Sequence, residues 1–556
     1  MKKIIECVPN ISEGKNKDII NKVLQDSNNV EFSQIVDVDS GYDTNRTVIT
    51  IIGEPDAVLE SAFLLIKSAS ELIDLNNHSG SHARMGATDV CPIIPVQNVT
   101  MEECIEYSKI LAKRVDLELN IPVYLYEKSA TKPERINLAN IRKGEFELMS
   151  EKIKRNKWKP DYGNRTIHPK AGVIAIGARN YLIAYNINLN TMDRKIASDI
   201  ALDIREAGRA KRDKNGKIIR SKNGTIVKVP GTLKATKAVG WYLDEYKISQ
   251  VSMNLTDFNT TSIHKAFEEV RIQARKRGVR VTGSEIVGLV PKSALIDAGL
   301  FYLNKQNKSQ GIPENDIMHI ASMSLGLNDI APFEIDKKVI EKLIADNSNN
   351  ISNLKINDFL DLLSTDSPAP GGGSVAALGG AISSSLVSMV ANLTINNKKY
   401  IKVHDLMNDV AIKAQSLKNQ LNYLINEDTE AFNKIMEAFK LPKKSDVEIH
   451  TRLNSIQNAT MYAIEVPFKT LKLIYDVLIL SEDIIDKGNK NSFSDSGVAV
   501  EIAIASAKSA IMNIKINLNE ITDKNYKKDI RIKLSKINTN INKIAEKIRK
   551  KIDKTL

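Results

Sequence analysis

The sequence predicts an α/β protein of two subdomains with mixed sheets, followed by an all-α helical-bundle domain. Three observations support this fold class. Strand-like and helix-like segments alternate over the first 340 residues, a polar run interrupts the pattern near residue 345, and helical periodicity dominates from there on. The length of 556 residues, with 42% hydrophobic and 26% charged residues, is enough for three or four domains of ordinary size.

The first subdomain is predicted over residues 1–180. Apolar runs and amphipathic segments alternate there, which indicates an α/β unit with both parallel and antiparallel strand pairs. In chain order we expect strands at 4–8, 34–38, 47–52, 90–96 and 122–126, and helices at 15–24, 55–75 and 101–117.

The second subdomain is predicted over residues 181–342. Strands are expected at 182–187, 251–255 and 280–282, and helices at 191–208 and 262–276. Between them, residues 209–234 are rich in Lys, Arg, Gly and Asn and poor in apolar residues. This composition predicts an exposed, mobile hairpin or loop.

A linker over residues 343–353 leads to a helical domain over residues 354–556. Residues 367–397 contain no charged side chain and are long enough to cross a bilayer, but their many Gly and Ser residues favour a buried helix in a tight bundle. Near the C-terminus, isoleucines and a leucine recur every three or four residues from Ile530 to Ile552, which predicts an amphipathic helix with solvated lysines. We favour this over membrane or nucleic-acid binding.

Charge and cysteine usage restrict the possible partners and the compartment. The net charge is +12, but residues 527–556 hold eleven basic and three acidic residues, so the rest of the chain is nearly balanced. A nucleic-acid partner is therefore not expected. Cys7, Cys91 and Cys104 are too widely spaced for a disulfide framework, and Glu6 interrupts any signal-peptide apolar region. We expect a cytoplasmic protein.

The densest group of chemically active residues lies between His78 and Asp89. Three interpretations stay open for its two histidines. They could bind zinc together with Asp89 or Cys91, they could be structural, or one could be a metal-free general acid/base. We favour the last, because an imidazole titrates near neutral pH and suits proton transfer to and from amines.

Two further segments of this half carry groups that could hold a ligand. Asp39 and Arg46 lie where two predicted strands meet a loop, a common ligand position, although a surface ion pair is the alternative. Residues 161–172 form a loop bounded by Gly and Pro with potentially cationic side chains. It could hold an anion or be a solvated loop.

Seven ordered motifs in this half resemble the glutamate formimidoyltransferase family. They are residues 6–15 (ECVPNISEGK), 44–48 (TNRTV), His82 with 84–87 (RMGA), 89–92 (DVCP), 177–179 (GAR), 184–189 (AYNINL) and 240–243 (GWYL). The resemblance implies transfer of a formimidoyl group from N-formimidoyl-L-glutamate to tetrahydrofolate, with His82 as the catalytic acid/base. It also implies substrate contacts at Asp39 and Arg46. The folate-binding loop that it implies comprises Gly163, Asn164, Arg165, Thr166, Ile167, His168, Pro169, Lys170, Ala171 and Gly172.

The helical half contains two groups of functional interest. Residues 368–377 (PAPGGGSVAA) predict a turn and a Gly run before a helix, which suits either an anion site or a simple helix cap. Residues 426–432 (NEDTEAF) place three acids within four positions, so they cannot all face solvent on one side of a helix. A carboxylate turned inward is costly unless it is paired or functional.

These two groups, with residues 494–495, 516–518 and 521–523, resemble formimidoyltetrahydrofolate cyclodeaminase. The resemblance covers residue 354 to the C-terminus and implies that Asp428 is catalytic. Three features depart from the family pattern. Glu285 stands where a Gln is expected, the basic segment 209–234 is longer, and Asn426 precedes the acids where relatives can carry another Asp.

Together the two resemblances imply a bifunctional folate enzyme of histidine catabolism. Polyglutamylated tetrahydrofolate is the implied co-substrate, with no metal or redox cofactor, and the implied partners are small-molecule substrates and other copies of the chain, not nucleic acid or membrane. One alternative makes the helical half a methenyltetrahydrofolate cyclohydrolase. Another makes it a non-catalytic assembly module.

Overall fold

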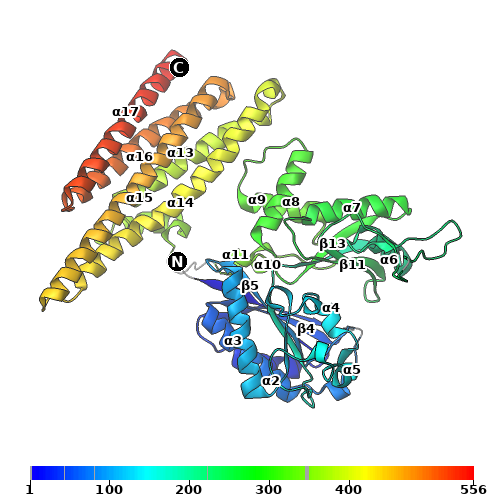
Figure 1. The fold of residues 1–556 in the computed structure, drawn as a ribbon. Coiled ribbons are helices and arrows are strands. Elements are labelled where there is room, and N and C mark those ends of the chain that lie inside the picture. The colour runs from blue at the N-terminus through cyan, green and yellow to red at the C-terminus, as the bar shows by residue number, and fades with distance from the viewer. Residues whose placement is uncertain (1–2, 43, 81, 222, 345–349, 556) are drawn as a thin grey trace. The chain divides into compact units, whose positions relative to one another are not determined.

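The computed structural model describes residues 3–42, 44–80, 82–221, 223–344 and 350–555 (Figure 1). The chain divides into two compact units. The α/β unit comprises residues 1–299 and 321–345, and the helical unit comprises residues 300–320 and 346–556. The predicted fold class, mixed sheets followed by long helices, is confirmed. Residues 345–349 of the predicted linker lie outside the described residues, and the predicted domain boundaries stay predictions.

The α/β unit begins with a seven-stranded mixed sheet. Its order is β1-β4-β2-β5-β7-β6, with β3 beside β4, and only the β5–β7 and β6–β7 pairs are parallel. The predicted mixed pairing is therefore correct. The strands are β1 (Ile4–Cys7), β2 (Asn10–Ile11), β3 (Ser33–Gly41), β4 (Arg46–Gly53), β5 (Thr88–Gln97), β6 (Val123–Leu125) and β7 (Ile174–Ala178).

Three long helices accompany this sheet, namely α1 (Lys17–Ser27), α2 (Pro55–Leu72) and α3 (Met101–Leu119). Ile5, Ile49 and Ile51 of the sheet belong to one buried apolar core with residues of these helices. Because side chains alternate along a strand, Glu6, which follows Ile5, and Arg46, three residues before Ile49, point to the opposite face. That second face carries the polar groups described below.

Shorter helices complete the first subdomain. The predicted helix over 55–75 ends earlier, at Leu72, and a 3-10 turn at Leu75–Asn77 follows it. The turn forms because the Asp74 side chain accepts a hydrogen bond from the Asn76 backbone N–H. The remaining short helices are α4 (Leu138–Arg142) and α5 (Glu145–Lys152), with 3-10 turns at Glu127–Ser129, Pro133–Arg135 and Asn156–Trp158.

The second subdomain contains a four-stranded antiparallel sheet in the order β11-β12-β8-β13. Its strands are β8 (Ile183–Leu189), β11 (Thr236–Leu243), β12 (Ile248–Leu255) and β13 (Val281–Val287). Its helices are α6 (Arg194–Ile204) and α7 (Ile263–Lys276), and the chain continues through α8 (Lys292–Lys305), α9 (Glu314–Leu325), α10 (Ile335–Lys338) and α11 (Ile340–Leu343).

The basic segment 209–234 is an exposed arm, as predicted (Figure 1). Short strands β9 (Arg209–Ala210) and β10 (Lys228–Val229) pair at its base. The arm contains an eight-residue repeat, RDKNGKII at 212–219 and RSKNGTIV at 220–227. In each copy the arginine donates a hydrogen bond to the carbonyl of the glycine four residues later, which closes the turn.

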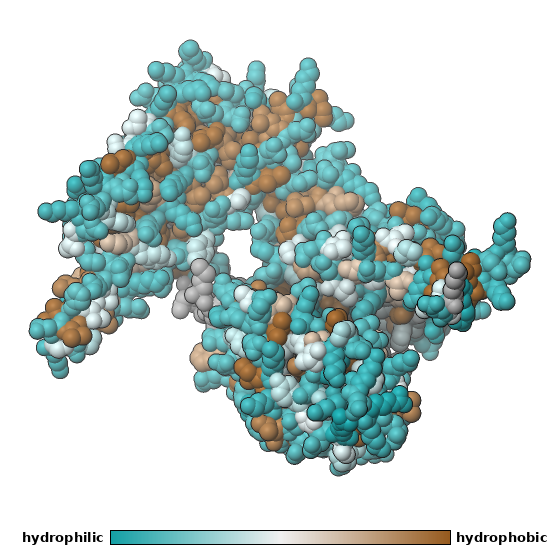
Figure 2. All heavy atoms as spheres, in the orientation of Figure 1, coloured by the Kyte–Doolittle hydropathy of each residue, from teal (hydrophilic) through white to brown (hydrophobic). Residues whose placement is uncertain are grey.

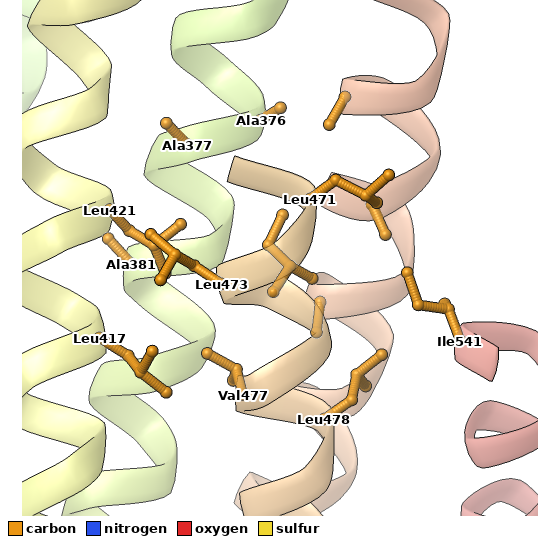
Figure 3. Close-up of a cluster of buried hydrophobic side chains, with 14 of the residues drawn as sticks. Ala376, Ala377, Ala381, Leu417, Leu421, Leu471, Leu473, Val477, Leu478 and Ile541 are labelled. Atoms are coloured by element: carbon orange, nitrogen blue, oxygen red, sulfur yellow. The ribbon is translucent and has the colours of Figure 1, made fainter. Parts of the chain in front are cut away.

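The helical unit is a bundle of long helices around one apolar core (Figure 3). A short 3-10 turn (Ile351–Asn353) and α12 (Ile356–Leu363) precede it. The long helices are α13 (Gly372–Ile395), α14 (His404–Lys440), α15 (Asp446–Lys487), α16 (Phe493–Asn519) and α17 (Lys524–Thr555), with 3-10 turns at Lys398–Val403 and Lys490–Ser492. Ile530, Leu534, Ile541 and Ile548 of α17 are buried, which confirms the predicted apolar stripe.

Small residues allow α13 to pack closely against its neighbours. A Cβ atom at Gly379 would lie 2.2 Å from the Ser506 Oγ of α16, so only glycine fits without a shift. By length and apolar composition alone, the segments 372–395 and 490–519 could cross a membrane, with mean hydropathies of 1.6 and 1.4. Buried fractions of 61% and 50% are also what core helices of a bundle show.

Candidate active sites

The first candidate site is a buried ion-pair network around Asp89, at the start of β5. Asp89 Oδ2 lies 2.8 Å from Arg46 Nη1 and 2.5 Å from Arg142 Nη2, and its Oδ1 accepts a 2.9 Å hydrogen bond from the Met85 N–H. Burial alone would raise the pKa of Asp89, but the two guanidinium groups lower it to about 2. Asp89 is therefore a carboxylate at neutral pH, and it offsets only one of the two positive charges.

His82 lies in the loop beside this network. Its Nδ1 is 2.7 Å from the carbonyl oxygen of Ala83, which can only accept a hydrogen bond, so Nδ1 carries the proton and Nε2 is left as an acceptor. Burial, Arg46 and Arg142 together lower the pKa of His82 to about 4. The imidazole is consequently neutral at pH 7, with Nε2 able to accept a proton.

His78 has a different environment from His82. Its Nε2 donates to the Asn45 carbonyl at 2.9 Å, and its Nδ1 accepts from Arg84 Nε at 3.1 Å. Both ring nitrogens are thus occupied, which fits a structural role and argues against a zinc ligand. Among the described residues, no group of three or more His, Cys, Asp or Glu side chains is placed to hold a metal ion.

The predicted folate loop ends directly beside the His82 loop. The N–H groups of Ala87 and Val173 donate to the carbonyls of Ala171 and Met85 at 2.9 and 3.0 Å, so the two loops are paired. Gly172 has φ +68°, and a Cβ there would lie 2.3 Å from the Met85 carbonyl oxygen. The loop therefore depends on glycine at this position to approach the predicted catalytic histidine.

The other residues of the loop differ in exposure. Ala171 and Gly172 are buried, and Gly163, Ile167 and His168 are half-buried. Asn164, Arg165, Thr166, Pro169 and Lys170 are exposed, so their side chains are open to a ligand. His168 Nδ1 accepts a 2.9 Å hydrogen bond from the Ala171 N–H, which fixes the tight turn that follows.

Asp39 and Arg46 lie on the polar face of the first sheet. Asp39 pairs with Val48 in β4, two residues from Arg46, so both side chains point to the same face. Arg46 Nε also donates to Asn10 Oδ1 at 3.0 Å. Burial and the neighbouring Asp37 raise the pKa of Asp39, and Glu285 of the second subdomain contributes to the same effect. The unusual Glu285 therefore lies close to a predicted substrate contact.

The second candidate site is in the helical unit, where α14 meets the first turn of α13. Ser374 Oγ donates to Asp428 Oδ2 at 3.1 Å and to the Ile425 carbonyl at 3.1 Å. A Cβ at Gly373 would lie 2.0 Å from Asp428 Oδ1, so the Gly run lets the carboxylate reach the helix N-terminus. Burial raises the pKa of Asp428, against the opposing effect of hydrogen bonds from Ser374.

The acids around Asp428 point in different directions, as the helical spacing predicts. Asp428 turns inward, whereas Glu427 accepts hydrogen bonds from the hydroxyls of Tyr423 and Tyr462. The Glu430 side chain is 54% exposed. Asp428 is therefore the member of this group whose carboxyl faces the Gly run.

Arg142 and Lys152 belong to the first site but were not predicted from the sequence. Lys152 Nζ donates to the carbonyls of Asn140, Ile141 and Lys143 at 2.7, 2.6 and 2.9 Å, and these residues surround Arg142 at the end of α4. Burial lowers the pKa of Lys152 to about 8. No local pattern in the sequence distinguishes these two side chains from exposed basic residues nearby.

Comparisons with known proteins cover both units. Residues 4–179 match the model for the formiminotransferase domain, N-terminal subdomain, residues 184–345 match that for the formiminotransferase domain, and residues 355–536 match that for formiminotransferase-cyclodeaminase. Formimidoyltransferase-cyclodeaminase of Mus musculus is 37% identical over 539 residues, which cover 97% of this chain and 96% of that protein.

Two relatives match one part of the chain each. Glutamate formimidoyltransferase of Streptococcus pyogenes serotype M1 is 44% identical over 307 residues, covering 55% of this chain and 95% of that protein. Methenyltetrahydrofolate cyclohydrolase of Methylorubrum extorquens is 41% identical over 174 residues, covering 31% of this chain and 84% of that protein. The match to the mouse protein spans both units at once, and the chain therefore belongs to the formimidoyltransferase-cyclodeaminase family.

Proposed function

We propose that this chain is a bifunctional folate enzyme of histidine catabolism. The α/β unit transfers the formimidoyl group of N-formimidoyl-L-glutamate to N5 of tetrahydrofolate and releases glutamate. The helical unit then closes 5-formimidoyltetrahydrofolate to 5,10-methenyltetrahydrofolate and releases ammonia. The observation that carries this proposal is the match to formimidoyltransferase-cyclodeaminase along nearly the whole chain.

In the proposed transfer step, His82 is the acid/base. N5 of the folate attacks the formimidoyl carbon, and the N5 proton passes to His82 Nε2, the nitrogen left free by the hydrogen bond to Ala83. The tetrahedral intermediate then breaks its bond to the glutamate nitrogen, which takes the proton back from His82 as it leaves. Because both substrates are held beside the imidazole, the reaction becomes effectively unimolecular.

In the proposed cyclisation step, Asp428 is the proton shuttle. N10 attacks the formimidoyl carbon attached to N5, the N10 proton passes to Asp428, and the former imino nitrogen leaves as ammonia after protonation. Burial raises the pKa of Asp428, which shifts its titration toward the pH range in which a carboxyl can both accept and donate a proton. Ser374 orients the carboxyl through its hydrogen bond to Oδ2.

The finer features of the function are part of the same proposal. Tetrahydrofolate is used in its polyglutamylated form, bound by residues 163–172 with further substrate contacts at Asp39 and Arg46, and no metal or redox cofactor takes part. The compartment is the cytoplasm, where Cys7, Cys91 and Cys104, all buried as free thiols, would stay reduced.

We also propose that the chain forms a homo-oligomer through its helices. Four apolar residues of α13 recur at helical spacing and are 37–44% exposed, namely Val375, Ile382, Met389 and Leu393. Figure 2 shows further apolar side chains at the surface of this unit. Such a face is typical of a helix that packs against another copy of the chain. Small-molecule substrates remain the other expected partners, with neither nucleic acid nor membrane.

The decisive experiment mixes the purified chain with tetrahydrofolate and N-formimidoyl-L-glutamate, without added metal. The near-ultraviolet band of methenyltetrahydrofolate and the release of ammonia are followed together. His82→Ala should abolish transfer but leave cyclisation of supplied 5-formimidoyltetrahydrofolate intact, and Asp428→Ala should do the opposite. Loss of both steps in either variant would contradict the assignment of two independent sites.

A rival for the helical unit is methenyltetrahydrofolate cyclohydrolase, because a protein of that name is 41% identical to part of it. This rival predicts that methenyltetrahydrofolate is hydrolysed faster than it is formed. Incubating the purified chain with methenyltetrahydrofolate alone, and following the loss of its absorbance, distinguishes the two. A stable absorbance would exclude the rival.

A further inference from the structure

The ion-pair network in the α/β unit carries an uncompensated positive charge. Arg46 and Arg142 both approach the same oxygen, Asp89 Oδ2, so one carboxylate faces two guanidinium groups. The Arg142 side chain is only 17% exposed. No residue among those described in the structure accepts a hydrogen bond from its buried Nε.

The contact between Arg142 and Asp89 is also incomplete. Arg142 Nη2 lies 2.5 Å from Asp89 Oδ2, but without the alignment of a hydrogen bond. A buried cation with unsatisfied donors is unfavourable, and an anion that supplies acceptors removes this cost. The empty hydrogen-bonding capacity of Arg142 therefore indicates an anionic ligand.

Arg142 is held in place by the rest of the subdomain. Lys152 Nζ donates to three carbonyls around the end of α4, so this short helix is fixed although it comprises only five residues. The side chain of Arg142 therefore emerges from a fixed backbone toward Asp89. A guanidinium that is fixed in advance loses little entropy when it binds a carboxylate.

We propose that Arg142 binds the α-carboxylate of the formimidoyl donor, an inference that rests on the proposed transferase function. The α-carboxylate is attached to the same carbon as the nitrogen that must leave. Arg142 lies close enough to His82 to lower the pKa of the imidazole, and both residues adjoin the network of Asp89 and Arg46. A carboxylate bound at Arg142 would thus bring the leaving nitrogen to the acid/base.

Binding of this carboxylate also makes His82 a better catalyst. Burial lowers the pKa of His82 most, and Arg46 and Arg142 lower it further, whereas the Ala83 carbonyl and Asp89 oppose this effect. A bound anion offsets their charge and raises the pKa of His82 toward its ordinary value. The imidazole then accepts and returns a proton near neutral pH only when the donor is present.

The test compares Arg142→Gln with Arg155→Gln, which removes an exposed arginine after α5 and serves as a matched control. Three donors are used, namely the N-formimidoyl derivatives of L-glutamate, of L-norvaline, which lacks the γ-carboxylate, and of 4-aminobutyrate, which lacks the α-carboxylate. Arg142→Gln should raise KM by about 10- to 100-fold for the first two donors. It should have little further effect on the third, which has no α-carboxylate to lose, or on the KM for tetrahydrofolate.

An equal loss with all three donors, or a rise only in the KM for tetrahydrofolate, would overturn the proposal. A merely structural role is tested by the pH dependence of kcat/KM with 4-aminobutyrate derivative. In Arg142→Gln, the pH below which kcat/KM falls should be higher than in the wild type, because the pKa of His82 rises when the Arg142 charge is removed. If that pH does not change, the electrostatic argument is contradicted. Cyclisation of supplied 5-formimidoyltetrahydrofolate should be unchanged in both variants, which shows that the helical unit is folded, and an unchanged urea unfolding curve by tryptophan fluorescence shows the same for the α/β unit.

A separate binding measurement distinguishes this proposal from the proposed function. If the wild-type chain transfers the formimidoyl group from none of the donors, the proposed transferase function is wrong. The carboxylate site at Arg142 can still be tested by measuring L-glutamate binding with titration calorimetry. Glutamate binding that is weakened about tenfold or more in Arg142→Gln, but not in Arg155→Gln, supports the carboxylate site. Equal glutamate affinity in both variants, or no binding to the wild-type chain, overturns it.

Discussion

Replacing Glu6 with glutamine should stabilise the α/β unit at alkaline pH. Glu6 is 2% exposed on β1, and no described residue forms a hydrogen bond with its Oε2. Burial raises its pKa from 4.5 to about 7, although the nearby Arg179 opposes the effect. Glu6 therefore loses its proton at a lower pH in the unfolded chain than in the folded one. As the pH rises from 4.5 toward 7, the wild-type protein loses stability. Glutamine does not titrate, so the variant avoids this loss.

The size of the effect follows from the shift in pKa. A shift of one unit corresponds to about 1.4 kcal/mol, so the full penalty above pH 7 is about 3 kcal/mol. Between pH 5 and pH 8.5, the difference in unfolding free energy between Glu6→Gln and wild type should increase by about 2–3 kcal/mol in favour of the variant. The cost of burying a neutral amide is nearly the same at both pH values and cancels in this comparison.

The chain offers a selective probe for this measurement. Its two tryptophans, Trp158 and Trp241, both lie in the α/β unit, so urea unfolding followed by tryptophan fluorescence reports on that unit in the full-length protein. Glu60→Gln is the control, because Glu60 pairs with Arg114 and its side chain is 41% exposed. The control should lose at most about 1 kcal/mol at either pH. A difference between Glu6→Gln and wild type that does not change with pH would refute the argument.

Three other substitutions test how the sites are built. Gly373→Ala should lower the cyclisation rate at least tenfold with little change in stability, because the new Cβ displaces the carboxylate of Asp428, the proposed proton shuttle. Gly372→Ala, with its nearest contact at 3.4 Å, should cyclise normally. Lys152→Met should lower the unfolding free energy by about 2–4 kcal/mol, because three carbonyls lose their hydrogen-bond donor. It should also reduce the rate of formimidoyl transfer. Gly172→Ala should destabilise the α/β unit more than Gly278→Ala in the same urea experiment. Both glycines have positive φ, but only Gly172 faces a backbone oxygen at 2.3 Å.

Much of the fold was predictable because its signals are local. The proline at the start of α2 and the Thr100–Glu103 capping box at the start of α3 set helix ends that the sequence displays directly. By contrast, β7 and β11 were missed. Strand β7 (Ile174–Ala178) is buried along its whole length and pairs in parallel on both sides, so it lacks the alternation that identifies a half-exposed strand.

The candidate sites were predictable only as far as their residues lie in recognisable motifs. His82 and Asp428 were predicted that way, and the structure adds the surroundings that lower the pKa of His82 and raise that of Asp428. Arg142 could not be identified, because its role depends on α4 packing beside the start of β5, a contact between segments far apart in the chain. The sequence around Arg142 resembles that of any exposed basic helix end.

Burial is the largest cause of both pKa shifts, but the charged and polar neighbours of His82 and Asp428 differ, and they match the charges of the groups that these residues are proposed to serve. The transfer site is rich in arginine, and its donor is an anion whose binding restores the basicity of the histidine. The formimidoyl group bound to N5 is an amidine, which is cationic when protonated, so a carboxylate can pair with it during cyclisation. Asp428 instead meets the hydroxyl and the helix N-terminus provided by Ser374, so its charge stays available to the amidinium ion. Exchanging the two environments would leave a histidine without its activating anion and a carboxylate already neutralised by arginine, and neither reaction would proceed.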